Sequence, residues 1–134
     1  MSRFAAQCAL IVSFGAAAGF MFAVPAVADA SSETVTAATH AELAANAGDL
    51  DGVHTHLHHA LNCLVGPGGN GFDAKALNPC AQSGHGAIPD SADAAKKSSL
   101  GAAADKAREG IAASDVKEAR ADASAAASLL KSSK

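Results

Sequence analysis

Apolar residues recur every three to four positions in four stretches after residue 28, and this spacing predicts four amphipathic helices. Turn-forming residues separate them. Gly48 is expected to end the first helix, Asp49 to cap the second, and the run GPGG from residue 66 to end the second. We expect helices from about Glu33 to Ala47, from Leu50 to Val65, from a cap at Asp90 or Ser91 to about Ala113, and from a cap at Ser114 or Asp115 to about Leu130.

Each predicted helix has one face that we expect to be buried. In chain order these faces comprise Thr36, His40, Leu43 and Ala47; Val53, Leu57, Ala60, Leu61 and Leu64; Leu100, Ala103, Ala104, Ala107 and Ile111; and Val116, Ala119, Ala123, Ala126 and Leu130. Gly110 is a second position at which the third helix could end. The turns at 47–49 and 113–115 are similar, Ala-Gly-Asp and Ala-Ser-Asp. The prediction is therefore an all-α fold, an antiparallel four-helix bundle of two helical hairpins.

A long segment without helical periodicity, residues 66–89, joins the two predicted hairpins. A loop of this length is unusual in a compact domain unless it is tethered or functional. Cys63 and Cys80 are the cysteines beyond residue 28, and an even number in an exported chain indicates a disulfide, with thiolate binding of a metal as the alternative. The disulfide would tie the loop to the second helix. The apolar residues expected to tuck beneath this loop as a small lid are Phe72, Leu77 and Ile88.

The first 28 residues have the organisation of a secretory signal peptide. Arg3 supplies a positive charge, an apolar run follows it, and Ala26-Val27-Ala28 provides a small-x-small cleavage pattern. An uncleaved membrane anchor is the alternative. Cleavage would remove Cys8 and leave residues 29–134 as a single domain in the periplasm or outside the cell, with no membrane attachment.

The composition of residues 29–134 narrows the possible partners. Among charged residues, removal of residues 1–28 takes away Arg3 alone, so nine Lys and Arg face thirteen Asp and Glu, and the formal net charge moves from −3 to −4. This mild acidity argues against nucleic acid or an anionic membrane surface as the partner. The segment also lacks Met, Trp and Tyr, so its core must consist largely of Ala, Leu and Val, and a disulfide or a bound ligand would help to stabilise it.

Histidines suggest the chemistry of this chain. The candidate metal ligands are His40, His54, His56, His58, His59 and His85, four of them within six positions of the second predicted helix. His54 and His58 are separated by four residues, a spacing at which two imidazoles on one helix can share a metal ion. We expect His40 to approach that pair from the first helix. His56 and His59 lie on the opposite flank, where we expect His85 to join them.

Imidazole suits Cu(II), Ni(II) and Zn(II), and it binds them in its neutral form. We therefore expect a transition-metal site that weakens as the pH falls below about 6.5. Each of these histidines also has a purely structural interpretation, as a hydrogen-bonded core residue or a solvated surface residue.

The segments THAE from residue 39, AGD from residue 47 and Val53 to Leu61 resemble the small periplasmic metal-binding proteins of nitrifying bacteria, which are helical hairpins rich in histidine. The resemblance covers mainly the first predicted hairpin. It implies metal buffering or transport outside the cytoplasm. The chain departs from that family because its last two predicted helices contain no histidine, and because it has the long loop and the cysteines.

Two alternatives to a metal-binding function remain open at this point. A haem-binding bundle could use His40 with His54 or His58 as axial ligands, although no Cys-x-x-Cys-His motif for covalent attachment is present. A non-catalytic module could instead bind a protein partner through the long loop. An enzyme is not expected, because the chain has no nucleophile elbow, phosphate-binding loop or paired-carboxylate arrangement.

Overall fold

The computed structural model describes residues 29–134, which form helices joined by loops and turns. The predicted signal peptide, its anchor alternative and Cys8 lie outside these residues. The five helices are α1 (Ala30–Ala45), α2 (Leu50–Val65), α3 (Ala87–Asp90), α4 (Ala94–Ala112) and α5 (Val116–Ser132). Within the described part of the chain, none of the helices is both long enough and apolar enough to cross a membrane.

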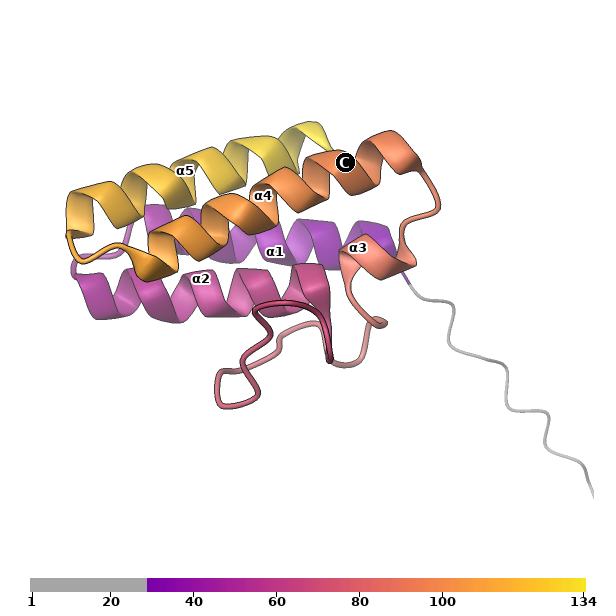
Figure 1. Cartoon of the computed structure of the whole chain (residues 1–134), viewed down its shortest axis with the longest axis horizontal. Helices are drawn as coiled ribbons and strands as arrows, with labels where there is room; N and C mark the ends of the chain where they lie inside the picture. The colour runs from indigo at the N-terminus through magenta and orange to yellow at the C-terminus, as the bar shows by residue number, and fades with distance from the viewer. Residues whose placement is uncertain (1–28) are drawn as a thin grey trace, which may run out of the picture.

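The four long helices lie alongside one another (Figure 1). α1 packs against α2 and α5, and α4 packs against α5 and α2, so each long helix has two principal neighbours. The short helix α3 and the loop before it lie at one side of this assembly, against α1 and α2. The prediction of an all-helical fold made of packed helices is confirmed.

Most helix ends follow the predicted capping residues, but α1 ends at Ala45 with Asn46 as its C-cap, ahead of the predicted stop at Gly48. Asp49 and Asp115 cap α2 and α5 as predicted, each accepting hydrogen bonds from backbone amides of the first turn. α1 begins three residues earlier than expected, because Asp29 caps it. The prediction that Asp90 or Ser91 caps the third long helix is wrong: these residues end α3, and the side chain of Asp93 accepts from Lys96 N to start α4.

The predicted buried faces of α2, α4 and α5 are largely confirmed. Residues on these faces with no more than 1% of their surface exposed are Val53, Leu57, Ala60, Leu61, Leu64, Leu100, Ala103, Ala104, Ala107, Ala119, Ala123, Ala126 and Leu130. The predicted face of α1 is wrong. Leu43 is 46% exposed, and α1 instead buries Ala37, Ala38, Ala41 and Ala44, so His40 lies at the edge of the buried face. Small alanines allow α1 to approach both of its neighbours closely.

Gly110 lies within α4 rather than at its end, so the predicted alternative stop is wrong. A Cβ atom there would lie 2.6 Å from Leu57 Cδ1 and 3.2 Å from Ala119 O. Glycine at this position therefore permits close packing of α4 against α2 and α5. The C-terminal cap of α4 is Ala113.

The long loop is tied down at several points. The predicted disulfide between Cys63 and Cys80 is present, which excludes the alternative that both sulfurs act as thiolate ligands in this oxidised form. The buried side chain of Asn62 binds the loop by donating to Asp73 O at 2.9 Å and Leu77 O at 3.2 Å, and by accepting from Asp73 N at 2.9 Å. Arg108 of α4 donates to Asn70 O at 2.9 Å.

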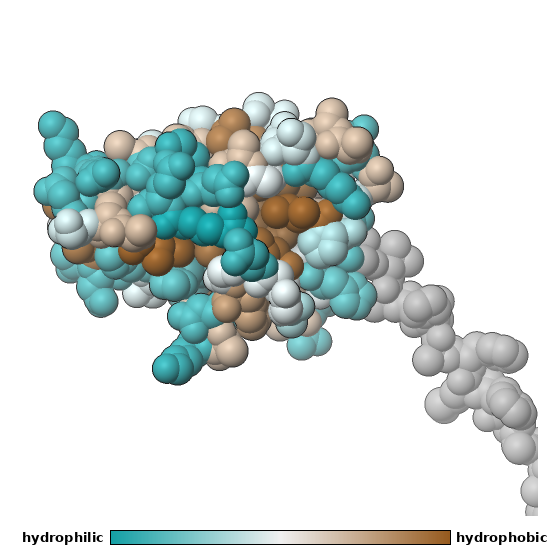
Figure 2. Space-filling view, in the orientation of Figure 1, coloured by the Kyte–Doolittle hydropathy of each residue, from teal (hydrophilic) through white to brown (hydrophobic). Residues whose placement is uncertain are grey.

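The loop is shorter than predicted, because α3 occupies its last residues. Phe72 and Ile88 pack against the core, as the expected lid required. Leu77 does not, since 63% of its surface is exposed. The face drawn in Figure 2 mixes polar side chains with patches of apolar ones. One shallow groove on the molecule is lined mainly by Val65, Ile88 and Pro89, with Lys97 and Arg108 at its edges.

Candidate metal centre

Three histidines from two helices come together where α1 packs against α2. His40 of α1 and His56 of α2 each lie eight residues from Gly48, so folding the chain about that glycine places them opposite one another. His59 follows His56 by three residues and lies on the same flank of α2. The three ring centroids are 5.1 to 5.7 Å apart. We call His40, His56 and His59 the His triad.

The His triad has the spacing of a metal site. Each ring offers one nitrogen, and these three atoms lie within 4.8 Å of one another. The Nδ1 atoms of His40 and His56 are 3.4 Å apart, which is longer than the usual N–H···N or N–H···O hydrogen bond of about 2.9 to 3.0 Å. Two imidazole nitrogens bound to one tetrahedral Zn²⁺ would lie about 3.4 Å apart, given metal–nitrogen bonds of about 2.0 to 2.1 Å. The separation therefore matches that expected for two nitrogens on one ion.

The surroundings favour the neutral, metal-binding form of these rings. Partial burial lowers the pKa of His40, and the neighbouring His59 and His56 lower it further because protonated rings would repel one another. The pKa of His59 is lowered by burial first, and then by His56 and His58. The Nδ1 atom of His59 is buried and has no hydrogen-bond partner, a polar atom that a bound ion or a water molecule could satisfy.

The predicted grouping of His40 with His54 and His58 is wrong. α1 packs along the flank of α2 that carries His56 and His59, whereas His54 points to the end of α4, with its Nε2 3.1 Å from Ala113 O. His58 faces the loop, with its Nδ1 3.7 Å from Asp73 Oδ2. The helical spacing separated the two flanks of α2 but did not show which of them contacts α1.

The structure does not bring His85 to His56 and His59, contrary to the prediction. Its Nδ1 lies 3.3 Å from Asp90 Oδ1, and 82% of its side chain is exposed. This part of the loop is held against Gly66, the residue that follows α2. The backbones of Gly66 and Gly86 cross so closely there that a Cβ atom on Gly66 would lie 1.5 Å from His85 O.

Two buried polar residues were not identified from the sequence as important. One is Asn62, which organises the loop. The other is Glu33, which is fully buried and accepts a hydrogen bond from Gly86 N at 2.9 Å through Oε1, while Oε2 has no partner. Burial raises the pKa of Glu33, and the neighbouring Asp90 carboxylate raises it further. Glu33 shares a helical face with Ala37, Ala41 and Ala44, and this face could have indicated its burial.

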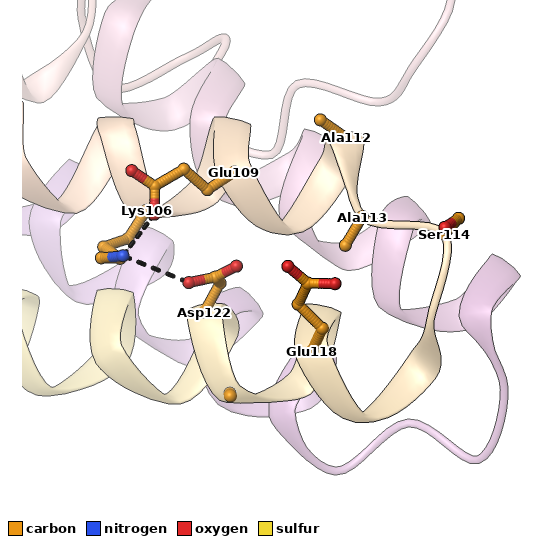
Figure 3. Close-up of a pocket in the computed structure, with 8 residues that line it drawn as sticks. Lys106, Glu109, Ala112, Ala113, Ser114, Glu118 and Asp122 are labelled. Atoms are coloured by element: carbon orange, nitrogen blue, oxygen red, sulfur yellow. Dashed lines mark hydrogen bonds and ion pairs between the residues drawn. The ribbon is translucent and has the colours of Figure 1, made fainter.

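An open cavity lies between α4 and α5, near the turn that joins them (Figure 3). Its lining includes three acidic side chains, Glu109, Glu118 and Asp122, and none of the predicted metal ligands. Lys106 already pairs there with Glu109 and with Asp122, which lies 3.3 Å away. These internal pairs leave the His triad as the better candidate for a functional site.

Comparison with known proteins adds no relative: no family model matches the chain, and neither a characterised protein nor a solved structure matches it significantly. The resemblance to small periplasmic metal-binding proteins therefore stays a prediction. Functional inference depends on the geometry of the chain itself.

Proposed function

We propose that the protein binds a transition-metal ion, copper, nickel or zinc, through the His triad. The observation that carries this proposal is the convergence of three imidazole nitrogens within 4.8 Å of one another. The lowered pKa values of His40 and His59 support it, because the rings need lose little or no proton to bind an ion at neutral pH.

Buffering or carrying the metal suits this site better than a purely structural role. Structural zinc sites usually have four protein ligands, whereas a site with three protein ligands leaves a position for water or for an incoming ligand. Within residues 29–134, no fourth histidine, cysteine or carboxylate joins the cluster. The three side chains are also only half-buried. An incoming ligand could therefore reach the ion and exchange with it.

The proposal includes an architecture and a location. We infer that the α1–α2 and α4–α5 pairs are two helical hairpins that form an antiparallel four-helix bundle, with the His triad in the first hairpin. Residues 1–28 have the pattern of a signal peptide, and the disulfide suits an oxidising compartment. We therefore propose that the protein works in the periplasm or outside the cell.

Calorimetric titration of the oxidised protein with Cu(II), Ni(II) and Zn(II) tests the proposal. We expect micromolar or tighter binding of at least one ion, and we expect alanine at His40, His56 and His59 together to weaken it at least about tenfold. The matched control is His85→Ala, which removes an exposed imidazole outside the triad. The same number of bound ions with the same affinities in the triple variant and the control would refute the site.

The affinity should also depend on pH. The pKa values of His40 and His59 lie below the ordinary value of 6.5, so both rings should remain neutral somewhat below that pH. Binding should then hold at neutral pH and be lost as the pH falls through the lowered pKa values, because protons compete for the ligand nitrogens. An affinity that stays unchanged through this fall in pH would contradict binding by imidazole.

The two alternatives gain no support from a specific contact. A haem would need space between its two axial histidines, and the Nδ1 atoms of His40 and His56 are only 3.4 Å apart. His54 contacts the backbone of Ala113, and His58 faces Asp73. A partner-binding role for the loop stays a prediction, so metal binding is the function that the geometry supports best.

A further inference from the structure

The loop places a carboxylate against α2 beside His58. His54, His58 and Asp73 line one open cavity of about 450 Å³ between α2 and the loop, and His59 of the triad and Lys75 line it as well. In Figure 1 this loop runs beside α2, between the end of α2 and α3. His58 and Asp73 are the closest pair there, with His58 Nδ1 3.7 Å from Asp73 Oδ2.

Asp73 is held in place by its neighbours. Its backbone N–H donates to Asn62 Oδ1, and its carbonyl accepts from Asn62 Nδ2, each at 2.9 Å. Its Oδ1 atom accepts from Lys75 N at 2.8 Å. These contacts fix the backbone and one carboxylate oxygen, and Oδ2 is the oxygen that faces His58.

The contact between His58 and Asp73 is not a hydrogen bond. A separation of 3.7 Å is too long for one, and His58 Nδ1 is buried with no hydrogen-bond partner. Such an atom needs a partner, which an ion or a water molecule can supply, because a buried polar atom is normally satisfied. An ion bonded to both atoms at about 2.0 to 2.2 Å would place them 3.7 Å apart at an angle of about 125°.

His54 supplies a third candidate ligand one turn before His58. Its Nε2 lies 3.1 Å from the carbonyl oxygen of Ala113, and a carbonyl can only accept, so Nε2 carries the proton. In the neutral ring, Nδ1 then has a free lone pair. His54, His58 and Asp73 do not gather within 4.8 Å of one another as the His triad does. His54 would therefore join the ion only by turning its ring and giving up its contact with Ala113 O.

We propose that His58 and Asp73, with His54 as the third ligand, form a second divalent-cation site that the loop completes. Its mixed imidazole and carboxylate ligands accept harder ions, such as Mn(II), more readily than three imidazoles do, and they also bind Zn(II). The site shares no ligand with the His triad, so each can be tested without the other.

Zinc stoichiometry in the oxidised protein tests this second site. The His40→Ala/His56→Ala variant removes the first site, and we expect it to bind one Zn(II) per chain. Adding Asp73→Asn or His58→Ala should weaken this remaining binding at least about tenfold. Adding Asp122→Asn instead, which removes a carboxylate on α5, should leave the remaining zinc affinity unchanged. Asn at position 73 keeps the backbone contacts to Asn62 and an oxygen that can accept from Lys75 N, so the loop should stay in place.

Paramagnetic broadening provides a second measurement that does not depend on zinc affinity. Mn(II) added to the His40→Ala/His56→Ala variant should broaden the amide signals of His58 and Asp73 before those of residues 40 and 56. Absence of zinc binding in that variant would overturn the proposal, as would binding that Asp73→Asn leaves intact. If the His triad alone fails as a site, the wild type and the His40→Ala/His56→Ala variant would each bind one Zn(II), and Asp73→Asn would weaken that binding in both.

Discussion

Replacing Asn62 with alanine should loosen the whole loop, since this one side chain makes three hydrogen bonds to it. Each such bond contributes about 1 kcal/mol net, so the variant should lose about 3 kcal/mol of unfolding free energy. The residue is fully buried, so no solvent is in place to satisfy the backbone groups left behind. For a domain of this size, the loss corresponds to a fall in Tm of about 12 °C or more.

Urea unfolding followed by circular dichroism measures this loss, and hydrogen exchange at Asp73 N reports on the loop directly. The matched control is Asn46→Ala, because Asn46 makes a single exposed bond to Glu42 O and should cost about 0.5 kcal/mol or less. Equal costs for the two variants would refute the reasoning. The same would follow if Asp73 N stayed protected from exchange in the Asn62 variant, since its acceptor would be gone.

Three further predictions concern stability. Gly110→Ala should destabilise the protein by about 1 to 3 kcal/mol, less any gain in helix propensity. Its control is Gly101→Ala, whose Cβ meets nothing within 4 Å and which should stabilise the protein by up to about 1 kcal/mol. If urea unfolding showed that both substitutions stabilise the protein, the packing described for α4 would be contradicted. Glu33 has a raised pKa, so wild-type stability should fall as the pH rises through that pKa, and Glu33→Gln should flatten this dependence in melts from acid to neutral pH. Reduction of the Cys63–Cys80 disulfide, which closes a loop with a sequence separation of 17, should cost about 3 kcal/mol, and an unchanged urea midpoint would show that the loop is held without it.

Local chemistry made much of the fold predictable from the sequence. α2 runs from Leu50 to Val65 as expected, because Asp49 provides a cap, the breaker at residue 66 follows, and the apolar stripe between them has a clear helical period. The predicted start of the third long helix is wrong because several residues that can cap a helix occur close together there. Asp90, Ser91 and Asp93 are all suitable caps, and local propensity does not choose among them.

The predicted buried face of α1 failed for a different reason. Alanines are spread around much of this helix, so its apolar stripe is weakly defined, and Leu43 was mistaken for a core residue. A helix with two packed neighbours also buries a wider surface than a single stripe suggests. Its burial of Glu33 depends on the loop, whose Gly86 N–H donates to that side chain.

The sequence by itself determined which histidines could act together along one helix, because residues three or four apart share a face whatever the helix packs against. It also determined the disulfide partners, since Cys63 and Cys80 are the cysteines of residues 29–134. Only the tertiary structure decided that His40 meets His56 and His59, and that Asp73 meets His58. The side on which α1 folds back, and the path of the loop, depend on packing between distant segments, and the spacing of residues along one helix contains no information about that packing.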